Sequence, residues 1–139
     1  MILHAGLVAR PAQGRWQGVL LLGPSGSGKS DLALRLLDHG FSLVADDRVL
    51  LWISGGRLFG RAPETLAGLV EARGVGILKA PVHAFTPVSL AVECVEGPVE
   101  RLPDGETVTF LDRALPLLRL VAREASAPAK LGRALMALG

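Results

Sequence analysis

Short apolar runs alternate with polar, glycine-rich segments along the 139 residues of the chain. Near the N-terminus, this pattern predicts a strand over residues 2–9 and a buried strand over residues 19–22. Residues 10–18 are rich in glycine, proline and glutamine and predict a loop between the two strands. Apolar positions at helical spacing then predict a helix over residues 28–39, and Gly40 supplies a left-handed stop.

The rest of the chain predicts further short strands. Residues 43–45 form a short buried strand, and residues 49–59 are expected to form a hairpin that turns at residues 54–57. The other expected elements are a short helix opening at residues 63–65, strands at 88–95, 107–111 and 117–121, and a last helix at 129–138. One strand–loop–helix unit among several hairpins predicts an α/β fold with a mixed sheet and flanking helices.

Composition narrows the class of protein. A length of 139 residues predicts one domain over residues 1–139, and a hydrophobic content of 50% predicts a packed core. No apolar run reaches the roughly 18 residues of a membrane span, and the N-terminus lacks the basic segment of a signal peptide. With a net charge of +2 and few aromatic residues, no nucleic-acid partner is expected. A cytoplasmic protein without a membrane partner is predicted.

The clearest chemical signal is a phosphate-binding loop between the strand at 19–22 and the helix that follows. The loop consists of Gly23, Pro24, Ser25, Gly26, Ser27, Gly28, Lys29 and Ser30. Its glycines let the backbone approach a phosphate, and its N–H groups face the anion at the helix N-terminus. Lys29 is expected to reach the β- and γ-phosphates, and the Ser30 hydroxyl is expected to bind Mg²⁺. The sequence predicts that the chain binds a nucleoside triphosphate.

Two adjacent carboxylates follow the short strand at residues 43–45. Ligands of open α/β sheets sit at the carboxyl ends of strands, so a neighbouring strand would bring Asp46 and Asp47 beside the γ-phosphate. One carboxylate could take a proton from a hydroxyl nucleophile, and the other could hold Mg²⁺ or its waters. The alternative is a solvated turn in which Arg48 pairs with either carboxylate.

Other polar residues carry weaker signals when each is taken alone. His4 ends or interrupts the first strand and would ordinarily be structural. Glu71 and Arg73 lie in a glycine-rich segment and could be either a surface pair or part of a site. Lys130 and Arg133 would ordinarily be solvated charges on the last helix.

Several segments together resemble the catalytic domain of HPr kinase/phosphorylase, the bacterial enzyme that phosphorylates a serine of the phosphocarrier protein HPr. The matching segments are residues 4–8, 23–30, 40–49, 69–77 and, more weakly, 128–133. The phosphate loop is shared by many families. The Ala-Asp-Asp-Arg-Val run at 45–49 and the Glu-x-Arg-Gly-x-Gly-Ile run at 71–77 are far more specific.

The resemblance implies a P-loop kinase domain whose phosphate loop is similar to that of phosphoenolpyruvate carboxykinase. By resemblance, Lys29 would neutralise the transferred phosphate, and Ser30 with Glu71 would hold Mg²⁺. Asp46 or Asp47 would act as the base toward the target serine of HPr and as the acid in the reverse dephosphorylation. The phosphate-handling shell would be completed by His4 and Arg133.

The resemblance also implies ATP as the phosphate donor and assembly into hexamers. The family's separate N-terminal domain and long C-terminal helical tail are not expected in this chain, and Ala134 stands where the family has Asn. Two alternatives stay open: an ATP-binding regulatory module that transfers no phosphate, and a small-molecule kinase or generic P-loop NTPase. The sequence lacks the Asn-Lys-x-Asp guanine motif, which argues against a GTPase.

Overall fold

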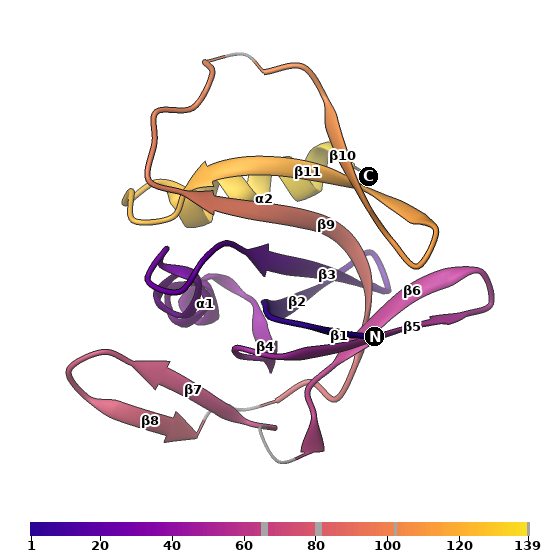
Figure 1. The fold of residues 1–139 in the computed structure, drawn as a ribbon, viewed down its shortest axis with the longest axis horizontal. Helices are drawn as coiled ribbons and strands as arrows, with labels where there is room; N and C mark the ends of the chain where they lie inside the picture. Colours follow the sequence, from indigo (N-terminus) through magenta and orange to yellow (C-terminus); the bar gives the residue numbers. More distant parts are fainter. Residues whose placement is uncertain (65–66, 80–81, 102, 139) are drawn as a thin grey trace.

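A curled mixed sheet forms the body of the molecule (Figure 1). The computed structural model describes residues 1–64, 67–79, 82–101 and 103–138. The strands of the first half are β1 (Ile2–Leu3), β2 (Gly6–Ala12), β3 (Arg15–Leu22), β4 (Ser42–Ala45), β5 (Val49–Ser54) and β6 (Arg57–Arg61). Those of the second half are β7 (Leu69–Ala72), β8 (Gly76–Lys79), β9 (Thr86–Val95), β10 (Glu106–Phe110) and β11 (Arg113–Val121).

Two helices complete the described part of the chain. Helix α1 (Lys29–Leu36) continues into a 3₁₀ turn (Leu37–His39), and Gly40 ends it with a left-handed φ of 82°. Helix α2 (Ala127–Ala137) begins after Ser126 with Pro128 in its first turn, two residues earlier than the pattern predicts. None of the described helices is long and apolar enough to cross a membrane.

Within the described residues, the main sheet has the strand order β1-β5-β6-β9-β3-β2-β4, with β11 on β9 and β10 on β11. Strands β3, β9 and β11 run parallel, whereas β2 is antiparallel to both of its neighbours. The prediction of a mixed sheet is therefore confirmed. Strand β4 runs in the same direction as β3 but is separated from it by β2, so the two are not direct neighbours as the sequence suggested.

Successive residues of the central strands bury opposite faces of the sheet, as strand geometry requires. Val8, Val19 and Leu21 pack with the apolar side chains of α1 and α2. On the other face, Leu7 and Leu20 join a second core that β5, β6, β10 and β11 enclose. Arg113 Nε donates to Gly56 O at 2.7 Å and links the β10–β11 and β5–β6 hairpins around this second core.

The N-terminal region differs from the prediction in two ways. His4 and Ala5 separate β1, which pairs with β5, from β2, which pairs with β3 and β4. Residues 10–18 are not a loop, because β2 and β3 continue into a hairpin whose turn is formed by Gln13 and Gly14 at φ 52° and 76°. The pairing of β4 with β2 ends at Ala9, so Pro11 lies at an open edge where proline is tolerated.

The hairpin β7–β8 forms a separate two-stranded sheet beside α1, at the lower left of Figure 1. Gly74 in its turn has a φ of 87°. The short helix expected from residue 63 falls partly on residues 65 and 66, which lie outside the described residues. The predicted hairpin at β5–β6 is confirmed, with Gly55 and Gly56 at its turn. Strands β9, β10 and β11 confirm the other predicted strands, with β11 starting four residues earlier than expected.

Candidate active site at the phosphate loop

The predicted phosphate loop connects β3 to α1 and has no room for side chains at its first position. A Cβ on Gly23 would lie 2.7 Å from Ser27 Oγ and 2.9 Å from the carbonyl oxygen of Cys94. Gly23 and Gly28 have φ values of 138° and 99°, which favour glycine. The glycine positions therefore follow from backbone geometry, as the motif predicted.

Lys29 is enclosed in the loop with only 9% of its surface exposed. Its ammonium donates hydrogen bonds to the carbonyl oxygens of Gly23 and Pro24. The Ser27 hydroxyl is also buried and has no hydrogen-bond partner among the described residues. A buried cation held by carbonyl groups and an unpaired buried hydroxyl both fit a loop whose remaining partner is an anion.

Asp46 connects the phosphate loop to the β7–β8 hairpin. Ser30 Oγ donates to Asp46 Oδ1 at 2.7 Å, and the backbone N–H of Glu71 donates to Asp46 Oδ2 at 3.0 Å. Asp46 is 8% exposed, so its carboxylate is buried and has one partner on each oxygen. This carboxylate positions the residues around it.

Asp47 points in a different direction, toward the N-terminal strands. Its Oδ1 lies 2.7 Å from His4 Nε2, and Arg48 Nε lies 3.7 Å from its other oxygen. The side chain is 58% exposed. The turn depends on a left-handed backbone at Asp47, with φ 71°, and the N–H of Ala5 donates to the Asp47 carbonyl at 3.1 Å. The two adjacent carboxylates therefore have different environments.

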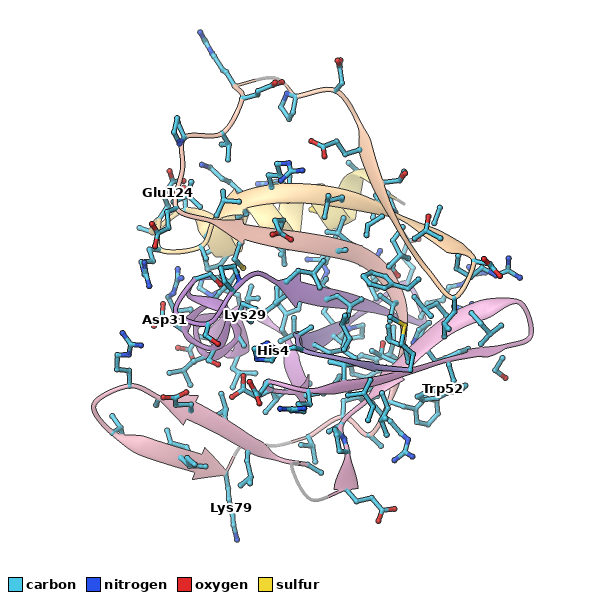
Figure 2. All side chains as sticks on the ribbon, viewed as in Figure 1. His4, Lys29, Asp31, Trp52, Lys79 and Glu124 are labelled. Carbon is cyan, nitrogen blue, oxygen red and sulfur yellow. The ribbon has the colours of Figure 1, made fainter. Side chains whose placement is uncertain are left out.

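A cavity of about 480 Å³ opens over the loop between α1 and the β7–β8 hairpin. Its lining residues come from five parts of the chain: His4, Ser25, Gly26, Gly28, Lys29, Ser30, Asp31, Leu34, Asp47, Glu71, Ala72, Arg73, Val75 and Arg123. Figure 2 shows His4, Lys29 and Asp31 near one another on the side of the sheet that faces the hairpin, whereas Lys79 points away from the site. His4, Asp47, Glu71 and Arg73 thus share one cavity with the phosphate loop.

Besides Arg73, the cavity is lined by a second arginine, Arg123, which the sequence did not single out. It follows β11, and its guanidinium donates to the carbonyl oxygen of Gly26 and lies 3.6 Å from Glu96 Oε1. Arg133 instead is exposed on α2 and is not among the residues that line the cavity. The structure therefore does not bring Arg133 to the loop, because α2 runs away from the end of the sheet at which the loop lies (Figure 1).

Arg123 is held in place by contacts on either side of it. Arg35 Nη1 donates to Glu124 O at 3.1 Å, and its Nη2 donates to the carbonyl of Ala122. Lys130 Nζ donates to the Glu124 carboxylate at 2.7 Å. These contacts fix the turn between β11 and α2. The fixed turn holds Arg123 beside Gly26 of the phosphate loop.

The oxygen donors near the loop fit a magnesium ion. The Ser30 hydroxyl, the Asp46 carboxylate and the Glu71 side chain belong to residues that are linked by hydrogen bonds or share the cavity. No group of three or more His, Cys, Asp or Glu side chains suited to a metal occurs within the described ranges. Mg²⁺ needs no such cage, because it takes one or two carboxylates together with waters and substrate phosphates.

Comparison with known proteins gives a family for this site. The sequence profile described as "HPr Serine kinase C-terminal domain" matches residues 15–86, which is just over half of the chain. The chain is 38% identical over 119 residues to an HPr kinase/phosphorylase of Brevibacillus brevis, covering 76% of this chain and 38% of that protein. It is 53% identical over 62 residues to an HPr kinase/phosphorylase of Leptothrix cholodnii, covering 44% of this chain and 19% of that protein.

The fold has a solved counterpart. The structure of the Hpr(Ser) kinase/phosphatase from Coxiella burnetii matches with a TM-score of 0.84 and 24% sequence identity, and it covers 99% of this chain and 89% of that chain. The predicted P-loop kinase fold is thereby confirmed. The chain spans less than half the length of the curated relatives that it matches. From the profile match over residues 15–86, we conclude that the chain belongs to the family of the HPr serine kinase C-terminal domain.

Proposed function

We propose that this chain is an ATP- and Mg²⁺-dependent protein serine kinase that phosphorylates HPr or a homologous phosphocarrier. The observation that carries the proposal is the Asp47–His4 pair, 2.7 Å apart, in the same cavity as the phosphate loop. A module that only bound nucleotide would not need a carboxylate facing the space beyond the phosphates. The names of the relatives, HPr kinase/phosphorylase, supply the protein substrate.

Asp47 is the base in this proposal. A general base must reach the hydroxyl proton that it removes, and Asp47 lines the cavity with a side chain that is 58% exposed. Both oxygens of Asp46 already accept hydrogen bonds, and its side chain is buried. His4 Nε2 contacts Asp47 Oδ1 and orients the carboxylate toward the incoming serine.

Lys29 and Arg123 stabilise the charge of the transferred phosphoryl group. Both cations now contact carbonyl oxygens of the loop, Lys29 at Gly23 and Pro24 and Arg123 at Gly26. Phosphate oxygens are stronger acceptors than these carbonyls, so binding of a triphosphate moves both cations onto the ligand. Phosphoryl transfer depends mainly on this kind of positioning and charge stabilisation.

Ser30, Asp46 and Glu71 are proposed to hold the magnesium ion. When bound, Mg²⁺ would neutralise part of the negative charge of the phosphate groups. Asp46 takes part from a fixed position, because Ser30 and the Glu71 backbone restrain its two oxygens. The reverse dephosphorylation would use the same groups, with protonated Asp47 as the acid. Assembly into a homo-oligomer, a hexamer by resemblance, stays a prediction.

The test is transfer of labelled phosphate from ATP to the serine of purified HPr, with wild-type protein and Asp47→Asn. We expect wild type to label HPr and Asp47→Asn to lose about 10²–10⁴-fold in rate while still binding ATP, since only the proton acceptor is removed. Asp38→Asn is the matched control, because Asp38 is exposed on the 3₁₀ turn after α1. ATP binding by wild type without any labelling of HPr would refute the proposed kinase and favour a regulatory nucleotide sensor.

A further inference from the structure

A second cavity lies at the other end of β3 from the phosphate loop. Its volume is about 550 Å³, within the range of small-molecule sites. The residues that matter for its chemistry are Gln13, Arg15, Trp16, Gln17, Arg57 and Ser89. The β2–β3 turn, the β5–β6 hairpin and the end of α2 all lie toward the right of Figure 1, whereas the phosphate loop lies at the left.

The polar lining of this cavity is positively charged. Arg15 comes from the start of β3 and Arg57 from the start of β6, so two separate hairpins each contribute an arginine to the lining. No carboxylate is among the described residues that line it. Neither arginine forms an ion pair within the described part of the chain, whereas Arg35, Arg119 and Arg123 each do. Two cations without an anion favour an anionic ligand.

Neighbouring contacts restrain the groups around these arginines. The Arg57 guanidinium lies over the Phe59 ring at 5.6 Å from its centroid, which restricts its position. The Trp16 ring stacks on His83 with a centroid distance of 3.7 Å and is thereby fixed at the wall of the cavity. The cavity is therefore built from restrained side chains on two of its sides.

Gln17 adds a directed hydrogen-bond donor. Its Oε1 accepts from Arg10 Nε at 3.4 Å, and Arg10 itself is anchored by donating to Gly132 O at 3.2 Å. With the carbonyl end of the amide taken by Arg10, the NH₂ end is left as a donor. Gln17 and the Ser89 hydroxyl therefore add hydrogen-bonding groups to the lining that holds the two arginines.

We propose that this second cavity binds a small phosphomonoester, with its phosphate group between Arg15 and Arg57. The planar guanidinium presents paired N–H donors that match the oxygens of a phosphate. The cavity is larger than inorganic phosphate needs, which leaves room for an organic group beside Trp16. The site is separate from the phosphate loop, so it stands whether or not the chain is a kinase.

Tryptophan fluorescence offers a local test. The chain contains two tryptophans, so Trp52→Phe leaves Trp16 as the only one. In this background, inorganic phosphate titrated at constant ionic strength is expected to give a saturable change in Trp16 emission. Arg15→Gln and Arg57→Gln should each weaken the apparent affinity about tenfold or more, as expected for loss of a charge-assisted hydrogen bond. Arg61→Gln, an exposed arginine on the same strand as Arg57, is the matched control and should bind as before.

Lys29→Ala distinguishes this cavity from the phosphate loop. The Trp16 response should persist in the Lys29→Ala background, because the two sites lie at opposite ends of β3. The indole N–H resonance of Trp16 in the wild-type protein gives a second readout that needs no tryptophan substitution. Absence of a saturable change in Trp16 emission from folded protein would overturn the proposal. So would an unchanged phosphate affinity in both Arg15→Gln and Arg57→Gln, or loss of the Trp16 response on Lys29→Ala substitution alone.

Discussion

The Ser30 hydroxyl donates a hydrogen bond of 2.7 Å to Asp46, which lies 16 positions further along the chain. The contact joins the N-terminus of α1 to the end of β4, although β2 separates β4 from the strand that leads into the loop. A serine and a carboxylate that meet beside a phosphate loop are the usual protein ligands of Mg²⁺ in phosphoryl-transfer sites. The contact therefore holds two proposed metal ligands together before the nucleotide arrives.

Replacing Ser30 with alanine should weaken nucleotide binding only when magnesium is present. Because Ser30 Oγ and Asp46 Oδ1 form one unit, Ser30→Ala removes a metal ligand and leaves Asp46 with one partner fewer. We expect affinity for ATP with Mg²⁺ to fall about tenfold or more, and affinity in EDTA to change little. Calorimetric titrations under both conditions measure this difference. Ser54→Ala, at the exposed end of β5, is the control.

Substitution of Arg123 should impair phosphate transfer far more than substitution of Arg133. Arg123 contacts Gly26 of the loop, whereas Arg133 is exposed on α2 and lies outside the cavity lining. We expect Arg123→Gln to lower kcat/KM for ATP by about 10²-fold or more, and Arg133→Gln to stay within about threefold of wild type. Steady-state kinetics of both variants give the two kcat/KM values and show which arginine acts in phosphate transfer. A larger defect in Arg133→Gln would restore the role that the family resemblance gave to that residue.

Gly18 should not tolerate even a methyl group. An added Cβ would lie 2.4 Å from Pro87 O and 2.7 Å from Thr86 Cγ2, so β3 and β9 would have to separate. We expect Gly18→Ala to lower the free energy of unfolding by about 1–3 kcal/mol, the usual cost of overpacking. Urea denaturation gives this value. Gly105→Ala is the matched control, because no atom of the residues that the structure describes lies within 4 Å of its Cβ position. Equal stability of the two variants would contradict the close approach.

The lone cysteine should be chemically inert in the folded protein. Burial raises the pKa of the Cys94 thiol from 9.0 to about 11, so the reactive thiolate is scarce near neutral pH. Alkylation by iodoacetamide should be slow in the native protein and fast in denaturant. The unfolded chain ionises first as the pH rises, so the fold loses stability between pH 9 and 11. Cys94→Ala lacks this decline, and parallel stability curves for the two proteins over that range would contradict the raised pKa.

The phosphate loop could be predicted residue by residue because its determinants are local. Lys29 donates to carbonyl groups of the same eight residues, and the flanking strand and helix are contiguous with the loop. The proximity of Asp46 to Ser30 also followed from the carboxyl end of a nearby strand. The different roles of Asp46 and Asp47 could not be predicted, because they depend on the left-handed backbone at Asp47 and on a histidine 43 residues away.

The failures of prediction involve contacts between distant segments or ambiguous local composition. Arg123 meets Gly26 across 97 positions, and nothing near it in the sequence distinguishes it from a solvated arginine. The composition of residues 10–18 predicts a loop, because glycine, proline and glutamine are compatible with a loop and with a hairpin alike. Its strand character comes from pairing of β2 with β3, in which Pro11 faces Trp16.

The hydrogen bond from the Glu71 backbone N–H to the Asp46 carboxylate couples the β7–β8 hairpin to the phosphate loop. That N–H belongs to a hairpin that forms its own two-stranded sheet, yet its acceptor is the carboxylate that also accepts from the phosphate loop. An ion or nucleotide that shifts Asp46 must therefore alter the environment of the Glu71 amide. The ¹H–¹⁵N resonance of Glu71 is thus a natural spectroscopic reporter of loop occupancy, readable without turnover, without a protein substrate and without any label beyond the isotope.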